Sequence, residues 1–385
     1  MSLELDQLID RLTGDAAWSA LNNFKDRHLF RIDMRHVLGH CRPFGAFSEE
    51  LTELAELVVS KALDLAWRQL VADHGAPKLK DGITDCEWVT AGLGKFGGIE
   101  MGFASDIEMM LFYSESGRTA GVNSVSNAIF FDQMVSAVAA GIRAPQDGIF
   151  HVDLRMRPFG QAGSAAVTLQ DFEQYYGQEG PAWPYERQAM VKFRCFAGSR
   201  VFGQRVTGAC HKAIYSAGWF DFSAMRAMRE RQIRQLVRGG SINAKLSDGG
   251  IVDCEYAVQA LQLTFGRDMI TLRHPNTLQV LREASRLSLI DPQQRIVIER
   301  TYVFLRELID CLRMVRGNAK DLTIPAANSR DWLQLSHRMR TIHASEVPLD
   351  NLEEQMKLVR DFSFIVEQHC RKMRQHRKGE DRQDD

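Results

Sequence analysis

Residues 92–113 read GLGKFGGIEMGFASDIEMMLFY, and this stretch decides how the middle of the chain folds. Glycines crowd its first part, and an apolar run closes it. Two acidic residues, Asp106 and Glu108, stand one residue apart where that run begins. Side chains alternate between the two faces of a β-strand, so both carboxylates are predicted on one face and Ile107 on the other, in a core. Two carboxylates beside a glycine turn suit a site for a divalent metal and phosphate.

A second stretch, residues 148–158, reads GIFHVDLRMRP and alternates strictly. It predicts a strand over 149–157 with Asp153, Arg155 and Arg157 on one face. If this strand lies beside the first, three carboxylates converge and can share two Mg²⁺ ions, with the arginines near phosphate oxygens. The predicted catalytic residues and metal ligands are then Asp106, Glu108 and Asp153. The alternative for each strand alone is a solvated face of a sheet.

The glycine turn predicts a triphosphate site, because glycine lets a ligand approach the backbone closely. The residues expected to hold the phosphates are Gly94, Lys95, Gly97 and Gly98. A strained turn with a solvent-exposed lysine is the alternative. Ser105 either bonds a phosphate or caps the turn, and the sequence favours neither.

Two further patterns keep their alternatives. Lys192 and Arg194, expected on a helix, are candidate nucleotide ligands, although an exposed basic face explains them more simply. Asp253 and Glu255 stand two apart at an expected helix start, so their side chains diverge. Favourable charge at a helix N-terminus is the default interpretation there.

The order of these parts resembles the DNA polymerase β-type nucleotidyltransferase superfamily, and three blocks resemble one family more closely. The blocks are residues 92–108, residues 152–160 (VDLRMRPFG) and residues 249–259 (GGIVDCEYAVQ). They are similar to the signature blocks of glutamate–ammonia ligase (glutamine synthetase) adenylyltransferases, in that family's order. The resemblance implies Mg²⁺-dependent transfer of AMP from ATP to a tyrosine hydroxyl of glutamine synthetase. In the mechanism expected for that transfer, Asp153 is the candidate base. The resemblance also implies the PII signalling protein and glutamine as candidate effectors.

Members of that family usually comprise two similar halves, and this chain resembles one of them. Residues 182–192 (AWPYERQAMVK) are similar to a pattern of the second, AMP-transferring half, which is the favoured interpretation. The alternative is the half that removes AMP by phosphorolysis, because the metal ligands do not encode the direction. The family usually has aspartate where this chain has Glu108. That departure implies displaced oxygens at the metal, and so a reduced rate or a preference for Mn²⁺ over Mg²⁺.

Two other functions have to be weighed. Residues 92–97 fit the dinucleotide motif G-x-G-x-x-G, but a new strand is expected about eight residues later, too soon for the crossover helix of a nicotinamide-dependent oxidoreductase. A catalytically idle regulatory module is favoured only by Glu108. The retention of Asp106, Asp153 and the two arginines argues against it.

The amino-acid composition limits which classes of protein and partner are possible. The 385 residues are 45% hydrophobic and 25% charged, typical of a soluble globular protein with several domains. The 48 basic and 49 acidic residues nearly balance, which disfavours a nucleic-acid partner. Seven cysteines without a C-x-x-C pair favour a reduced cytoplasm over disulfides or zinc. No run approaches the ~20 apolar residues of a membrane span, so no membrane partner is expected.

Periodicity predicts an α+β fold in which a small mixed β-sheet, polymerase β-like, is flanked by helices. The expected parts are an N-terminal helical segment (1–76), a nucleotidyltransferase domain (77–198), a C-terminal helical bundle (199–370) and a disordered charged tail (371–385). Helices are expected at 48–74, 124–142, 276–289 and 292–316, and strands at 88–93, 107–113 and 149–157. Residues 77–84 are expected to form a polar linker, and nearly everything after Leu169 is expected to be helical.

Overall fold

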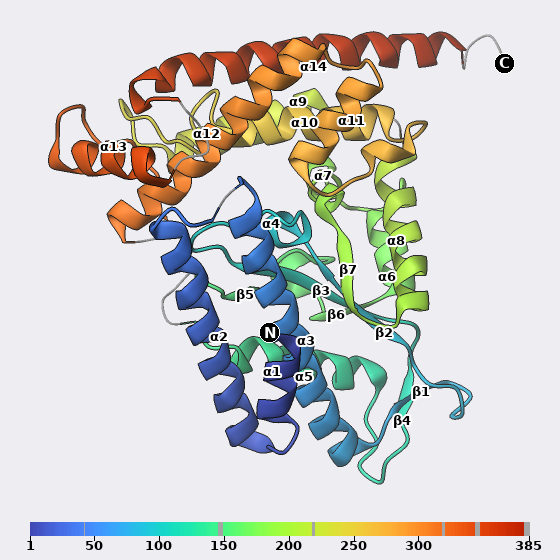
Figure 1. The fold of residues 1–385 in the computed structure, drawn as a ribbon. Coiled ribbons are helices and arrows are strands. Elements are labelled where there is room, and N and C mark those ends of the chain that lie inside the picture. The colour runs from blue at the N-terminus through green and yellow to red at the C-terminus, as the bar shows by residue number, and fades with distance from the viewer. Residues whose placement is uncertain (42, 145–148, 218–219, 318–319, 343–346, 381–385) are drawn as a thin grey trace. The chain divides into compact units, whose positions relative to one another are not determined.

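The computed structural model describes residues 1–41, 43–144, 149–217, 220–317, 320–342 and 347–380 (Figure 1). Two compact units make up the chain. The N-terminal unit comprises Met1–His36, Gly45–Ala182 and Lys192–Ala213, and the C-terminal unit comprises Val37–Phe44, Trp183–Val191 and Ile214–Asp385. The chain therefore enters the C-terminal unit twice before it continues there from Ile214.

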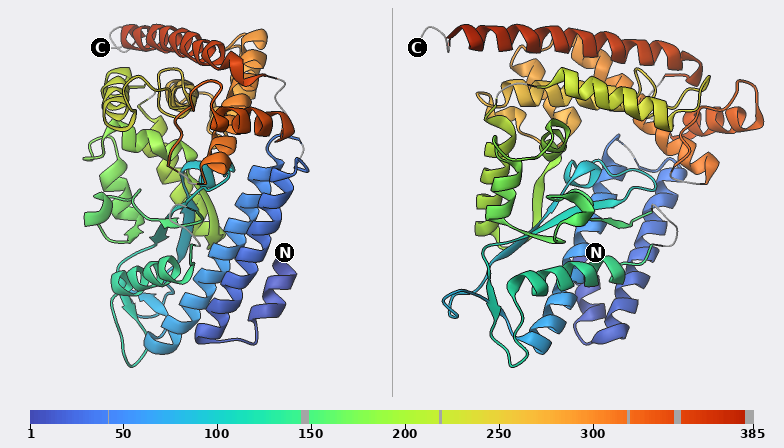
Figure 2. Two further views of the ribbon diagram at one scale, coloured as in Figure 1. Left: turned by 90° about the vertical axis from the view of Figure 1, so that its left-hand side faces the viewer. Right: turned by 180° about the vertical axis from the view of Figure 1, so that it is seen from behind.

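A five-stranded mixed sheet is the framework of the N-terminal unit (Figure 2). Its strands are β2 (Trp88–Gly92), β3 (Ile107–Tyr113), β5 (Val152–Asp153), β6 (Ala166–Thr168) and β7 (Arg194–Gly198). β2 is antiparallel to both β3 and β7, whereas β5 and β6 run parallel to β3 and pair with opposite ends of it. A separate ribbon joins β1 (Pro77–Leu79) to β4 (Gly117–Thr119). The sheet is thus built around β3.

Helices cover both faces of β3 through aromatic contacts. Those lying wholly or mostly in this unit are α1 (Ser2–Ile9), α2 (Gly14–Val37), α3 (Ala46–His74), α4 (Gly94–Gly97), α5 (Asn127–Gly141), α6 (Leu169–Tyr176) and α8 (Arg200–Tyr215), with the 3-10 turn η1 (Gly160–Ala162). Tyr113 stacks on Phe131 of α5, with ring centroids 4.9 Å apart. Phe112, which points the other way, meets Phe172 of α6 edge to face at 5.3 Å. These rings bury large apolar areas and fix how α5 and α6 sit on the sheet.

The C-terminal unit is helical in the part that the structure describes. Its elements are α7 (Pro184–Ala189), η2 (Met190–Lys192), α9 (Phe222–Leu236), α10 (Ile251–Phe265), η3 (Ile270–Leu272), α11 (Thr277–Arg286), α12 (Pro292–Arg316), α13 (Arg330–Ile342), η4 (Leu349–Asn351) and α14 (Leu352–Glu380). α14 lies along α10 (Figure 1). The bounds of α12 follow from sequence: Asp291 caps its start, Pro292 occupies the first position, and Gly317 ends it with a φ of +64°.

The predicted α+β fold is confirmed. β2 and β3 match the strands predicted at 88–93 and 107–113, and α3 and α12 match the helices predicted at 48–74 and 292–316. α5 and α11 confirm the other two helices with shorter bounds. No helix within the described ranges is long and apolar enough to cross a membrane. All seven cysteines are free thiols.

The strand predicted over 149–157 is wrong in its length, since β5 covers only Val152–Asp153. Asp153 causes the early end: its Oδ1 accepts the backbone N–H of Arg155 at 2.9 Å, which turns the chain. Pro158 then removes another backbone donor. Arg155 and Arg157 therefore lie outside the sheet and do not continue the face of Asp153.

Other local predictions also need correction. The predicted linker at 77–84 contains β1, whose pairing with a distant strand has no local signal. β7 interrupts the region predicted to be helical, because it completes the edge of the sheet beside β2. α14 continues to Glu380 through the first part of the predicted disordered tail, and the pair of Arg371 with Glu367 one turn earlier supports the helix where that tail begins. Residues 381–385 lie outside the described ones. The domain boundaries predicted at 76/77 and 198/199 stay predictions.

Candidate functional site

Two neighbouring strands bring the predicted carboxylates together. Glu108 of β3 is paired in parallel register with Asp153 of β5, and Ile107 is paired with Val152. Asp106 directly precedes β3, two residues from Glu108, and so lies on the same face. Ile107 and Val152 alternate to the opposite face and are buried. The sheet therefore places all three acidic residues on one face of adjacent strands.

The glycine turn between β2 and β3 lies directly against one of these carboxylates. The amide of Leu93 donates to the carbonyl oxygen of Glu108 at 2.9 Å. Gly94 has a φ of +51°, and a Cβ atom there would lie 1.7 Å from Oε2 of Glu108. Only glycine satisfies both the left-handed backbone and this close approach. The turn and the acidic strand are thus one fitted arrangement.

In the second half of the turn, the backbone amides donate to carbonyl groups of the same turn. The amide of Gly97 donates to the carbonyl of Leu93 at 2.8 Å, and that of Gly98 donates to the carbonyl of Gly94 at 3.1 Å. A Cβ on Gly97 would meet the carbonyl oxygen of Lys192 at 1.9 Å. This geometry gives Gly97 a packing role, and the phosphate contacts predicted for Gly97 and Gly98 stay predictions. Gly94 and Lys95, which open α4, keep theirs as a proposal.

The strands beside the turn exclude the dinucleotide-binding interpretation. A Rossmann site requires parallel strands joined by a crossover helix. Here β2 and β3 are antiparallel, and the helix between them, α4, spans only Gly94–Gly97. The match to G-x-G-x-x-G is therefore a coincidence of glycine spacing.

Arg155 holds the carboxylate of Asp153. Its Nε lies 3.0 and 2.9 Å from the two oxygens, and Nη2 lies 2.6 Å from Oδ2. Burial acts to raise the pKa of Asp153, but hydrogen bonds from the side chain and backbone of Arg155 outweigh it and hold the pKa below its ordinary value. The hydrogen bond and charge of Asp153 raise the pKa of Arg155, and the charges of Glu108 and Asp106 add to this. One guanidinium thus lies in the field of all three carboxylates.

The donor set suits a hard divalent cation. Mg²⁺ takes oxygen ligands and keeps several waters, so three carboxylates plus phosphate oxygens are sufficient. Among the described residues, no three acidic, histidine or cysteine side chains are arranged to hold an ion together. Asp153 faces Arg155 instead, and the Arg155 side chain is 70% exposed. The residues fit a metal in type and in strand position, and binding requires Asp153 to exchange Arg155 for the ion.

Three other predicted site residues have local partners. Ser105 caps its turn, since its Oγ accepts the amide of Gly102 at 2.9 Å, which is one of its two predicted roles. Arg157 donates to the carbonyl oxygens of Leu154 and Gly163 and so secures its own loop. Lys192 is buried and lies 2.5 Å from Glu100, which corrects the expectation of an exposed helical lysine.

Arg194, which the sequence placed on a helix with an exposed basic face, lies instead at the start of β7 and supports the glycine turn. From the start of β7 its Nε donates to the carbonyl of Gly97 at 2.9 Å, and Nη2 reaches the carbonyl of Phe96 at 3.3 Å. The same group pairs with Glu56 of α3 at 2.5 Å. A cation at the carbonyl end of a short helix satisfies its last acceptors. These contacts join segments far apart in the chain, so no local sequence pattern predicts them.

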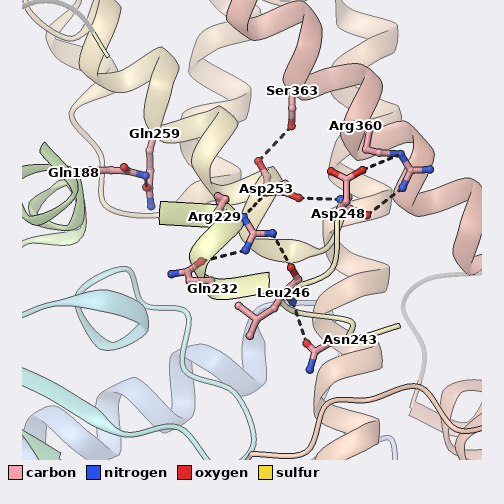
Figure 3. Close-up of polar contacts among 11 residues, drawn as sticks. Gln188, Arg229, Gln232, Asn243, Leu246, Asp248, Asp253, Gln259, Arg360 and Ser363 are labelled. Atoms are coloured by element: carbon pink, nitrogen blue, oxygen red, sulfur yellow. Dashed lines mark hydrogen bonds and ion pairs between the residues drawn. The ribbon is translucent and has the colours of Figure 1, made fainter. Parts of the chain in front are cut away.

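The third signature block lies in the C-terminal unit, at the start of α10 (Figure 3). Asp253 accepts from Nε of Arg229 at 2.7 Å and from the amide of Gly249 at 2.8 Å. Arg229 also donates to the carbonyl of Leu246 at 2.8 Å and is 5% exposed. The predicted helix-terminal role of Asp253 is confirmed. The block therefore ties α9 to α10 and to the loop before α10.

A second buried contact connects two family-like segments within the same unit. Nε2 of Gln188 in α7 donates to Oε1 of Gln259 in α10 at 2.7 Å (Figure 3). Both side chains are buried. A buried amide pair fixes relative position because each unsatisfied group would be costly.

A glycine turn followed by paired acidic strands is the arrangement expected of a nucleotidyltransferase domain. The model of the glutamate–ammonia ligase adenylyltransferase family matches residues 2–209. The model of the GlnD PII-uridylyltransferase family matches residues 223–374. The chain belongs to the glutamate–ammonia ligase adenylyltransferase family.

Three relatives are each a "bifunctional glutamine synthetase adenylyltransferase/adenylyl-removing enzyme". The protein of Pasteurella multocida is 28% identical over 408 aligned residues, covering 99% of this chain and 40% of the relative. That of Methylococcus capsulatus is 33% identical over 296 residues, covering 75% and 30%. That of Hahella chejuensis is 31% identical over 311 residues, covering 79% and 32%. The chain thus spans two fifths or less of the length of these relatives.

Proposed function

We propose that this chain transfers AMP from ATP to a tyrosine hydroxyl of glutamine synthetase, in the cytoplasm. The observation that carries the proposal is the register pairing of Glu108 with Asp153, with Asp106 on the same face. The names of the relatives support AMP chemistry on glutamine synthetase. Their double activity leaves addition and removal as the two candidate directions.

In the proposed reaction the tyrosine oxygen forms a bond to the α-phosphorus of ATP, the bond to the bridging oxygen breaks, and pyrophosphate leaves. The phenolic proton passes to a base. A free tyrosine has a pKa of about 10, so the hydroxyl needs activation at neutral pH. A divalent metal held by Asp106, Glu108 and Asp153 would neutralise phosphate charge and ease that deprotonation when bound.

The residues around the metal site have separate tasks. Gly94 lets the backbone approach the phosphates, with Lys95 beside it. Arg155 is exposed enough to turn from Asp153 to a phosphate oxygen, where its fork of donors fits. The predicted role of Asp153 as a base depends on that release, because a carboxylate with a lowered pKa is a weak proton acceptor.

Removal of AMP is the second candidate, supported by the "adenylyl-removing" part of the relatives' names. Inorganic phosphate would attack the same phosphorus, with tyrosine as the leaving group and ADP as the product. The same residues would serve. The match of residues 223–374 to the PII-uridylyltransferase model supports the PII signalling protein as a candidate effector, and glutamine stays an expectation from the sequence resemblance.

The test follows the mass of the tyrosine peptide of glutamine synthetase. Unmodified glutamine synthetase is incubated with the chain and ATP, and adenylylated glutamine synthetase with the chain and phosphate, each with Mg²⁺ or Mn²⁺. Asp106→Asn removes one proposed ligand. Asp85→Asn, at an aspartate whose side chain is 78% exposed on a loop of the same unit, is the matched control.

A gain of one AMP mass, lost in Asp106→Asn and kept in Asp85→Asn, is the expected result. Loss of AMP from the adenylylated protein without any gain on the unmodified one would assign the removing direction. Activity in Asp106→Asn equal to the parent's would end the proposal.

A further inference from the structure

A cavity of about 330 Å³ opens in the N-terminal unit beside the loop that follows Asp153. Its walls are mainly apolar, with a few polar groups. Among the residues that line it are the apolar or aromatic Pro158, Phe159, Tyr175 and Pro181 and the polar Asp171 and Gln174. A concave apolar pocket with a few polar groups is the usual form of a small-molecule site.

This cavity lies on the same side of the sheet as the carboxylates. Val167 of β6 lines it and pairs in register with Phe112 of β3. Phe112 follows the alternation of Asp106 and Glu108, and its ring packs on α6, whose residues form another wall. The pairing positions of β5 and β6 on β3 differ by four residues, from Glu108 to Phe112, which is about 13 Å along a strand.

Phe159, one of the residues that line the cavity, has an unusual backbone conformation. Its φ is +62°, in the left-handed region that a bulky side chain rarely adopts. Its side chain is 66% exposed, although the ring packs edge to face on Tyr175 at 4.8 Å. Backbone strain that presents an aromatic ring to solvent costs free energy and concentrates at functional sites. The ring is therefore presented for contact with something outside the chain.

We propose that this cavity receives the nucleobase of ATP, with the base against Phe159, an inference that rests on the proposed AMP transfer. A nucleotide whose phosphates lie at the carboxylates places its base at the far end of the molecule, which suits a cavity on the same face further along the sheet. Asp171 offers an acceptor, and Gln174 a donor and an acceptor, for the polar edge of a purine. Aromatic rings stack on the face of a base.

An aromatic side chain of the protein acceptor is the other occupant to consider. The hydroxyl that attacks phosphorus must lie at the carboxylates. A tyrosine ring is much shorter than about 13 Å, the strand distance to the cavity, so the attacking residue does not fill it. The separation of cavity and carboxylates favours the longer molecule.

The test separates the base from the phosphates. Phe159→Ala is expected to weaken binding of ATP with Mg²⁺ about tenfold by calorimetry, since loss of one ring–base stack has about that effect. Tripolyphosphate, which has no base, is expected to bind unchanged. Phe159→Trp is expected to retain ATP affinity. Phe30→Ala on α2, at a phenylalanine 68% exposed, is the matched control.

The outcomes distinguish this inference from the function beneath it. Equal weakening of ATP and tripolyphosphate, or no weakening of ATP while Asp106→Asn still loses activity, overturns the base site and leaves AMP transfer standing. A rise in KM for glutamine synthetase with unchanged ATP affinity also overturns it, in favour of the acceptor. Failure of the parent protein to bind ATP overturns both.

Discussion

The same spacing of acidic residues occurs twice in this chain with opposite consequences. Asp106 and Glu108 flank the start of a strand, so they share a face with each other and with Asp153. Asp253 and Glu255 lie in the first turns of α10, where residues two apart point about 200° away from each other. Only the strand can gather carboxylates. The secondary structure around an acid pair therefore decides whether the pair is able to form a metal site.

The arginines that hold Asp153 and Asp253 also differ between the two regions. Arg155, which holds Asp153, has a side chain 70% exposed, whereas that of Arg229, which holds Asp253, is 6% exposed. When the Arg155 pair opens, the freed guanidinium is solvated, but opening the Arg229 pair leaves a buried guanidinium without its partner. An ion pair with an exposed arginine, such as Arg155–Asp153, can thus be replaced by a ligand. One with a buried arginine, such as Arg229–Asp253, holds two helices together.

The largest effect expected is on activity at the strand pair. Asp153→Asn is expected to lower the rate of AMP transfer about a thousandfold, because a metal ligand supports several kcal/mol of transition-state stabilisation. The denaturation midpoint is expected to stay close to the parent's. Asp253→Asn serves as the comparison, measured by the same peptide mass assay. An equal loss in Asp253→Asn at unchanged stability would break the distinction between the two regions.

The next effect concerns stability at the helix pair. Asp253→Ala is expected to lower the free energy of unfolding of the C-terminal unit by about 3 kcal/mol, because Arg229 would remain buried without its partner. The amide of Gly249 would also lose its acceptor. Urea titration followed by circular dichroism measures the change. Asp248→Ala, at a neighbouring aspartate whose side chain is 76% exposed, is the control, and a loss there as large as in Asp253→Ala would contradict the burial argument.

A third effect measures how closely the strand site is fitted. Gly94 and Gly14 have nearly equal left-handed φ values, +51° and +54°, but a Cβ on Gly14 meets nothing within 4 Å. Alanine at either position costs about 1–2 kcal/mol for the backbone. Gly94→Ala is expected to cost about 1–3 kcal/mol more, because its Cβ collides with Glu108.

A double variant separates the clash with the Glu108 side chain from the backbone strain at Gly94. Glu108→Ala combined with Gly94→Ala is expected to recover the additional loss and leave the backbone part, a coupling that denaturation of the four variants measures. Equal losses in Gly14→Ala and Gly94→Ala would show that the glycine serves the backbone alone.

Sequence reasoning reached the parts of this fold that local chemistry determines. The alternation of Ile107 to Tyr113 located β3, and the caps Asp291 and Gly317 located α12. It failed where distant partners decide. β7 forms because β2 offers it an edge, and Arg194 acts through the glycine turn and α3.

The candidate site shows the same division. The strand periods predicted the shared face of Asp106, Glu108 and Asp153, because side-chain alternation is a local property. The extent of the second strand was wrong, since Asp153 ends it by bonding the amide of Arg155. A side chain that competes with the sheet for a backbone donor is visible only once the turn is seen.

The smallest effect expected is at Arg155 itself. Arg155→Ala is expected to lower the free energy of unfolding at neutral pH by only about 1 kcal/mol, because the guanidinium is exposed and water can take its place beside the Asp153 carboxylate. Arg229→Ala, the matched variant at the buried arginine, is expected to lose several times more, since it empties a buried volume and leaves both Asp253 and the carbonyl of Leu246 without their donor. Denaturation of both variants in one buffer provides the measurement. A loss at Arg155 as large as that at Arg229 would remove the contrast between an exchangeable and a fixed pair.

The effect of Arg155 on the free energy of unfolding is also expected to depend on pH. The folded pKa of Asp153 lies below its ordinary value, so this group stabilises the fold above the ordinary aspartate pKa of about 3.9. That contribution disappears as pH falls through the folded pKa. Arg155→Ala removes the hydrogen bonds that lower the pKa, so its stability is expected to fall less steeply than the parent's below about pH 4. Parallel slopes for the two proteins in an acid titration would mean that Arg155 does not control the ionisation of Asp153.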